Sequence, residues 1–351
     1  MRILIGVQGT GNGHLSRCAA LAEALATLPI QVDFLMSGRP RAGFFDMEPF
    51  GDWQWRQGLT FAVQNGRVAL RETVRRNNWK QFWRDVYELD LSRYDLVVSD
   101  YEPVTAWAAR KQQRRVIGIG RQYAFYKPCH GLPISTPHRQ LLRWFAPAND
   151  VVGMHWSNGG PHILPPVIHQ RGPQRAREDN HYLVYLPFEP LPRIHRLLQG
   201  LSDYRFSVFH PAMTQKQVGS VRYYSPSRDG FAEAFSRACG IISNAGFETS
   251  SEALWHGKKL LVRPLAGQFE QQANARCLRQ LQLATVIKDL DKAELSNWLE
   301  HGRARRCCWP NVATELAQWL ATGAERPVSE LSKALWRKTD TADYQGLLQR
   351  R

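Results

Sequence analysis

The stretch IISNAGFETSSEALWHGKKLLVRPLAGQFEQQANA (residues 241–275) decides the fold expected for this chain. A short apolar strand at 241–242 leads into a turn of small residues. A helix is predicted to open near Thr249, where Ser and Thr side chains can cap it. A second strand at 260–262 ends at Pro264. Because open α/β sheets bind ligands beyond the carboxyl ends of their strands, both turns are expected to line one ligand site.

The order of polar residues in this stretch is specific. Backbone N–H groups at a turn and helix N-terminus favour an anion. Glu252 stands six positions after Gly246, and an acidic residue followed by Gln, with Asn three positions later, occurs at 270–274. An ordinary βαβ unit explains the Ser and Thr cluster but not these acidic and amide residues.

This pattern resembles the donor-binding half of GT-B glycosyltransferases, in particular the MurG-like enzymes (glycosyltransferase family 28 C-terminal type) and a little-described bacterial and archaeal branch of them. The resemblance implies that the turn and helix bind the donor diphosphate and that Glu252 binds the ribose. It also implies that the loop near Ser227 and Arg228 meets the nucleobase. The donor contacts implied in this half are Ser227, Arg228, Ser243, Asn244, Ala245, Gly246, Thr249, Glu252, Gln268, Glu270, Gln271 and Asn274.

Length and charge are consistent with this reading. A chain of 351 residues is long enough for two domains. Its 46 Lys and Arg against 31 Asp and Glu give a net charge of +15. Such a balance favours acidic partners, namely a nucleotide diphosphate, an anionic membrane surface or nucleic acid, without choosing among them.

Cysteine usage and the ends of the chain predict a cytoplasmic protein. The six cysteines are scattered without metal-ligand spacing, so reduced thiols are expected. Neither a signal peptide nor an apolar run long enough to cross a membrane is recognised.

The N-terminal segment opens a Rossmann-like unit. An apolar strand at 3–5 is followed by the loop Gln8-Gly-Thr-Gly-Asn-Gly13 and a helix that begins with His14. The glycines follow neither the dinucleotide order nor a P-loop. The loop resembles the first loop of the same transferases, which implies that Gly11 and Gly13 approach the donor. His14 is then the candidate general base, because the attacking hydroxyl must lose a proton. Its alternative role is a helix-starting His that bonds a loop carbonyl.

A catalytic His often needs a carboxylate to orient it. Asp100 ends the strand that begins at Leu96, and Glu102 precedes Pro103, the expected first residue of a helix. Asp100 either reaches His14 or serves, like Glu102, the N-terminus of that helix. Glu102, Gln122 and Tyr123 are predicted acceptor contacts, although the loop that holds Gln122 and Tyr123 equally suits a packed loop.

Residues 44–90 are rich in Trp, Phe and Arg. An Asn65-Gly66 hairpin turn is expected, followed by one amphipathic helix over 71–89 with basic residues on one face. A basic, Trp-rich helix is typical of interfacial membrane binding. The alternative is that the aromatic residues form the domain core.

We therefore predict an α/β protein of the GT-B class, with two Rossmann-like domains facing across a central cleft. The expected parts are an acceptor domain at 1–160, a linker at 161–180, a donor domain at 181–328 and a helical segment at 329–351 that packs back on the first domain.

The expected activity is transfer of a sugar from an NDP-sugar, with UDP favoured, to an acceptor hydroxyl. Inversion is expected, with His14 and Asp100 as the catalytic residues and without a metal or other cofactor. The partners are the nucleotide-sugar donor, an unknown acceptor that is lipid-linked or at a membrane surface, and an anionic membrane bound peripherally at its inner face. A UDP-sugar 2-epimerase of the same fold, with Asp100 and Glu102 as acid and base, is the alternative enzyme. A basic nucleic-acid-binding protein is the alternative without catalysis, but no motif supports nucleic acid as a partner.

Overall fold

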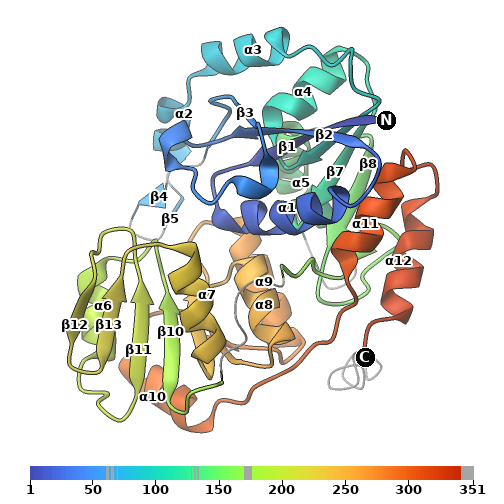
Figure 1. The fold of residues 1–351 in the computed structure, drawn as a ribbon. Coiled ribbons are helices and arrows are strands. Elements are labelled where there is room, and N and C mark those ends of the chain that lie inside the picture. Colours follow the sequence, from blue (N-terminus) through green and yellow to red (C-terminus); the bar gives the residue numbers. More distant parts are fainter. Residues whose placement is uncertain are drawn as a thin grey trace. The chain divides into compact units, whose positions relative to one another are not determined.

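The computed structural model describes residues 1–60, 63, 64, 67, 68, 70–127, 129, 132, 134–169 and 176–340. The chain divides into two compact units, each with its own seven-stranded sheet in the described residues (Figure 1). The first unit comprises Met1–Ala62, Leu70–His169 and Trp309–Thr339. The second comprises Val63–Ala69, Gln170–Cys308 and Asp340–Arg351.

The sheet of the first unit is parallel throughout, with strand order β3-β2-β1-β6-β7-β8-β9. Its central strands are almost completely buried, which explains their continuous runs of Ile, Leu and Val. The strands are β1 (Arg2–Gln8), β2 (Gln31–Ser37), β3 (Gln54–Trp55), β6 (Leu96–Asp100), β7 (Val116–Gly120), β8 (Asp150–Met154) and β9 (Ile163–Leu164).

Helices cover this sheet and join its strands, as in a Rossmann-like unit. They are α1 (Asn12–Leu25), α2 (Leu70–Arg76), α3 (Trp79–Glu88), α4 (Pro103–Lys111), α5 (Thr136–Phe145), α11 (Val312–Ala321) and α12 (Val328–Arg337), with short 3-10 turns η1 (Arg41–Gly43), η2 (Glu48–Phe50) and η3 (Gln122–Phe125). Helix α1 packs against β1 and α11, and α3 packs on α4. The start of α1 therefore lies beside the carboxyl ends of β1 and β6.

The second unit repeats this architecture, with strand order β12-β13-β11-β10-β14-β15-β16. Only β12 in this sheet is antiparallel to its neighbour. The elements are β10 (His181–Tyr185), α6 (Leu191–Leu198), β11 (Arg205–Phe209), β12 (Lys216–Val218), β13 (Val221–Tyr224), α7 (Arg228–Arg237), β14 (Gly240–Asn244), α8 (Phe247–Trp255), β15 (Lys259–Arg263), α9 (Phe269–Gln280), β16 (Thr285–Val286) and α10 (Lys292–His301).

The chain returns to the first unit earlier than predicted. The return was expected at residue 329, but the first unit takes in Trp309–Thr339 and so includes α11 as well as α12. Helix α11 packs on α1, and Ser332 and Trp336 of α12 both donate hydrogen bonds to the backbone oxygen of Ile163, at 2.7 and 2.8 Å. The predicted domain boundaries at 160, 181 and 328 differ accordingly, and residues 170–175 and 341–351 lie outside the described part.

The aromatic segment also departs from its prediction. The single helix expected over 71–89 is two helices, α2 and α3, because Asn78 caps α3 by accepting a hydrogen bond from the backbone N–H of Gln81 at 3.0 Å. Strands β4 (Val63–Gln64) and β5 (Arg67–Val68) pair antiparallel, as a hairpin requires, while the turn residues 65–66 lie outside the described residues.

Candidate active site

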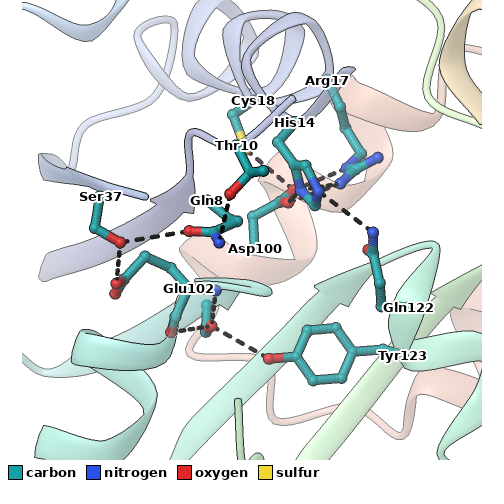
Figure 2. A network of polar contacts seen from close by, with 11 residues as sticks. Gln8, Thr10, His14, Arg17, Cys18, Ser37, Asp100, Glu102, Gln122 and Tyr123 are labelled. Atoms are coloured by element: carbon teal, nitrogen blue, oxygen red, sulfur yellow. Dashed lines mark hydrogen bonds and ion pairs between the residues drawn. The ribbon is translucent and has the colours of Figure 1, made fainter. Parts of the chain in front are cut away.

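The first cluster of polar residues lies at the carboxyl ends of the first sheet. Strands β1 and β6 are parallel neighbours, with Val7 opposite Asp100, so the loop after β1 begins beside Asp100. Helix α1 starts after Gly11, and His14 is its third residue. Figure 2 shows His14, Arg17 and Cys18 from α1 directed at Asp100 from β6.

His14 and Asp100 form a close pair. Nδ1 of His14 lies 2.5 Å from Oδ1 of Asp100, whose side chain is fully buried. An ionised carboxylate only accepts hydrogen bonds, so Nδ1 carries a hydrogen, and in the neutral ring the lone pair is on Nε2. Nε2 faces the amide of Gln122 at 3.3 Å. Asp100 was expected either to reach His14 or to serve the N-terminus of the next helix, and in the structure it contacts His14.

Arg17 and Cys18 also bind Asp100, and neither was predicted from the sequence. Arg17 donates from Nε to Oδ2 and from Nη2 to Oδ1, both at 2.7 Å, and the Cys18 thiol donates to Oδ2 at 3.1 Å. Burial opposes the charge of Asp100, but the Arg17 guanidinium and the His14 ring outweigh it and hold the pKa of this carboxyl below its usual range. The sequence feature that could have identified Arg17 is its position one helical turn after His14, on the helix side that faces the sheet.

Glu102 caps a helix and is not an acceptor contact, which corrects that prediction. Its side chain is fully buried and accepts hydrogen bonds from the backbone N–H groups of Val104 and Thr105, at 2.8 and 2.6 Å, and from the Ser37 hydroxyl at 2.6 Å. Burial raises the pKa of Glu102, although these hydrogen bonds act in the opposite direction.

Tyr123 is likewise a core residue, so its predicted acceptor role is corrected. Its ring is fully buried, and its hydroxyl donates towards Ser99 Oγ and the backbone oxygen of Ala146, each at 3.2 Å. A Cβ on Gly118 would lie 2.2 Å from this ring, so Gly118 provides the space that Tyr123 fills. Gln122 is the predicted acceptor residue that the structure does bring to His14.

The glycine loop is held by its neighbours. Gln8 donates to Thr10 Oγ1 and to the backbone oxygen of Leu59, both at 2.9 Å. Arg39 donates to the backbone oxygen of Gly9 and, at 2.9 Å, to Asn12 Oδ1. A Cβ on Gly11 would meet nothing within 4 Å, so the space beside the first turn of α1 is open there. Gly13 is the second residue of α1.

The second cluster follows β14 in the other unit. Helix α8 begins at Phe247, with Gly246 as its N-cap, so the predicted opening near Thr249 is two residues late. Thr249 is the third residue of the helix, and the N-cap residue Gly246 has no side chain to cap it. A Cβ on Gly246 would meet nothing within 4 Å. The positive end of the α8 dipole therefore lies beside this open space, where it suits an anion.

The residues before α8 are buried and fix the turn. Ser243, Asn244 and Ala245 are each at most 6% exposed. Asn244 Nδ2 donates to the backbone oxygen of Arg263 at 3.1 Å, which ties the ends of β14 and β15 together. The Arg263 side chain is buried in an ion pair with Glu189. Ser227 is an exposed N-cap residue of α7, and the side chain of Arg228 lies outside the described part.

The loop after β15 is organised by side chains that were predicted as donor contacts. Gln268 caps α9 by accepting from the backbone N–H of Gln271, whose own Oε1 accepts from Leu265 N at 3.0 Å. Asn274 is fully buried and donates to the backbone oxygen of Ala245 at 3.0 Å. These amides hold the loop, while the carboxylates of Glu252 and Glu270 belong to partly exposed residues.

Within the described residues, no group of three or more His, Cys, Asp or Glu is placed to hold a metal ion. None of the described helices is long and apolar enough to cross a membrane.

Comparison with known proteins identifies the family. A family model described as glycosyl transferase family 1 matches residues 1–301. The chain belongs to this family. It is therefore a glycosyltransferase, as its motifs indicated. No curated protein matches its sequence.

Solved structures confirm the GT-B class. MurG of Acinetobacter baumannii is 16% identical, with a TM-score of 0.54 over 96% of this chain and 99% of that one. SsfS6 of Streptomyces sp. SF2575, complexed with thymidine diphosphate, is 13% identical, with a TM-score of 0.57 over 96% and 99%. LpCGTa, in complex with UDP, is 14% identical, with a TM-score of 0.54 over 95% and 92%. At these identities the likeness concerns the fold.

Proposed function

We propose that this glycosyltransferase moves a sugar from an NDP-sugar, with UDP favoured, to an acceptor hydroxyl with inversion and without a metal. The observation that carries the proposal is the pair of His14 and Asp100, in which Nε2 of His14 keeps the lone pair needed to take a proton. General-base catalysis requires such a group near the attacking oxygen. In a direct displacement, the acceptor oxygen bonds to the anomeric carbon, the diphosphate leaves with the electron pair, and His14 receives the hydroxyl proton.

The open N-terminus of α8 is the proposed site for the donor diphosphate. The positive end of a helix stabilises a dianionic leaving group. Glu252 lies one and a half turns along the same helix, where a carboxylate suits ribose hydroxyls. The complexes of LpCGTa with UDP and of SsfS6 with thymidine diphosphate support a nucleotide donor for proteins of this fold.

A thermal-shift and calorimetry panel of UDP, GDP, dTDP and UDP-sugars tests the donor site. A ligand bound only by the native chain stabilises it, by about 2.7 kcal/mol at a hundredfold excess over Kd. We expect one nucleotide class to raise the melting temperature, and Glu252→Ala to reduce that shift. Glu300→Ala, an exposed change on α10 of the same unit, serves as the control. If no nucleotide shifts the wild type, the donor proposal fails.

A surface of the first unit suits a membrane-bound acceptor. Four indole rings from α3, α4 and α5 form a chain of contacts: Trp83 to Trp107 at 5.3 Å, and Trp107 to Trp144 and Trp144 to Trp79 at 6.1 Å between ring centres. We call Trp79, Trp83, Trp107 and Trp144 the tryptophan surface. Trp79 and Trp144 are 36% and 41% exposed, and nearby Leu141 is 50% exposed.

Cations on the same helices complete this surface. The exposed ones are Lys80 and Arg84 on α3, Arg110 and Lys111 on α4, and Arg143 on α5. Indole rings favour the membrane interface, and cations favour anionic lipids. Other aromatic residues of the segment are core, since Phe50 and Phe82 are at most 4% exposed. We infer peripheral binding to an anionic membrane, which would bring the enzyme to a lipid-linked acceptor.

The 2-epimerase alternative loses one of its candidate groups. It needs acid and base carboxylates that reach the sugar, whereas Glu102 is buried as a helix cap and Asp100 is bonded to Arg17 and His14. NMR of a reaction with UDP-sugar but without acceptor separates the two activities, because only an epimerase makes a new sugar nucleotide.

A further inference from the structure

Arg17 is buried beneath the candidate base. Its side chain is 2% exposed, and two of its hydrogen bonds occupy both oxygens of Asp100. One of those oxygens, Oδ1, also accepts the hydrogen of His14 Nδ1. His14 and Arg17 therefore share a single carboxylate, as Figure 2 shows.

The backbone around Arg17 makes room for its guanidinium. Gly120 ends β7 with φ +123°, a conformation that favours glycine. A Cβ at this position would lie 2.8 Å from Arg17 Nη2. The Arg17 guanidinium thus fills the space that the absence of a side chain at Gly120 leaves at the end of β7.

We propose that Arg17 is a positioning residue that shares Asp100 with His14 and thereby sets how strongly this carboxylate favours a positive charge on the His14 ring. The proposal rests on the proposed role of His14 as the base. It adds that the Asp100 carboxylate orients the His14 ring through one hydrogen bond, while Arg17 balances most of the negative charge of Asp100.

Electrostatics supports this division of roles. Arg17 Nη2 lies 3.1 Å from Nδ1 of His14, so an imidazolium would stand beside a guanidinium. His14 is also in the first turn of α1, where the helix dipole disfavours a positive charge. The Asp100 carboxylate by itself has the opposite effect, because a negative charge favours the imidazolium.

Two neighbouring groups are uncharged. From η3, Gln122 presents an amide to Nε2. From α1, Cys18 contacts Asp100, and burial together with Asp100 raises the pKa of this thiol, which keeps it protonated. Arg17 and Asp100 are thus charged groups in contact with His14.

The test follows the protonation of His14 directly. In full-length protein with isotope-labelled histidine, NMR records the ring nitrogens against pH, and His14→Gln assigns the signal. We expect Arg17→Gln to move the His14 titration midpoint to higher pH by about one unit, because a neighbouring positive charge is removed. Arg17→Lys keeps the charge and should leave the midpoint near that of the wild type. Arg337→Gln, an exposed change on α12, is the control for the first unit.

Activity against pH gives a second measurement. The acid limb of the kcat/KM profile should move with the NMR midpoint in Arg17→Gln. An unmoved midpoint in Arg17→Gln overturns the inference, as does an Arg17→Lys variant that loses activity by the same factor at every pH. The NMR result needs no substrate, so it stands even if no sugar transfer is found. If Arg17→Gln does not fold, Arg17→Lys decides: a His14 midpoint that moves although the charge is kept overturns the inference.

Discussion

Asn274 donates a hydrogen bond of 3.0 Å to the backbone oxygen of Ala245, and so joins α9 to the turn that opens α8. This bond is buried, and its acceptor residue, Ala245, directly precedes Gly246, the N-cap of α8. It fixes the turn that leads into the N-terminus of α8. The proposed phosphate site is thus held by a neighbouring helix.

Gly246→Asp should separate nucleotide binding from stability. An Asp at the N-cap accepts hydrogen bonds from the first N–H groups of α8 and stabilises the helix, while its charge repels a diphosphate. Gly246 has φ −70° and an open surrounding, so the side chain fits. We expect an unchanged or higher melting temperature and at least roughly tenfold weaker UDP binding by calorimetry, the scale of one lost charged contact. Gly246→Ala, which lacks a capping oxygen, should bind nearly as the wild type does. If the Asp variant binds UDP as tightly as the wild type, the N-terminus of α8 is not the phosphate site.

His14→Gln should abolish most of the transfer. Loss of a general base costs typically about a hundred- to ten-thousandfold in rate. Since Gln keeps the size and a hydrogen-bonding group, the melting temperature and the Kd for nucleotide should change little. The check is the initial rate of nucleotide release with acceptor, compared with His301→Gln, an exposed histidine on α10. A His14→Gln enzyme with near-normal kcat would exclude His14 as the base.

Asp100 should link stability to acid pH. Its pKa is lower in the folded chain than the usual value of about 3.9. Such a group stabilises the fold above that pH, and the contribution disappears as the pH falls towards the folded value. Asp100→Asn removes this dependence and also leaves Arg17 buried without a counter-charge, at a cost of about 3–5 kcal/mol.

Urea unfolding at neutral and at acid pH measures this effect. The double variant Arg17→Met with Asp100→Asn should recover part of the loss seen in Asp100→Asn, because no charge is left buried alone. A wild-type acid dependence that survives in Asp100→Asn would assign it to other carboxylates.

The tryptophan surface should bind anionic lipid. Trp79→Ser with Trp144→Ser is expected to lower sedimentation with vesicles that contain phosphatidylglycerol, whereas Val218→Ser, an exposed apolar change on β12 of the second unit, is not. Binding of the wild type should weaken with added salt and be slight on neutral vesicles. Equal sedimentation of the double variant and the wild type would leave this surface without a membrane role.

The fold class and the position of both clusters could be predicted from the sequence. Continuous apolar runs that end in Gly-rich or acidic turns, such as the run that precedes Asp100, specify buried parallel strands and place the polar residues at their carboxyl ends. Pro103 and Glu102 mark the start of α4 for local reasons of φ and hydrogen bonding. These features depend on short-range chemistry that the order of residues carries.

The tertiary structure alone decided which polar side chains meet. Asp100 and Glu102 are two residues apart and equally acidic, yet Asp100 ends β6 and contacts His14, whereas Glu102 follows the turn at Tyr101 (φ +54°) and caps α4. Arg17 lies one helical turn after His14 on α1, and only the tertiary structure brings it to Asp100, beside Gly120, where the absence of a side chain leaves room for the guanidinium. The return of the chain at Trp309 likewise depends on α11 packing against α1, a contact between residues some three hundred positions apart. Contacts of this kind follow from three-dimensional packing, because neighbouring residues in the sequence impose no constraint on them.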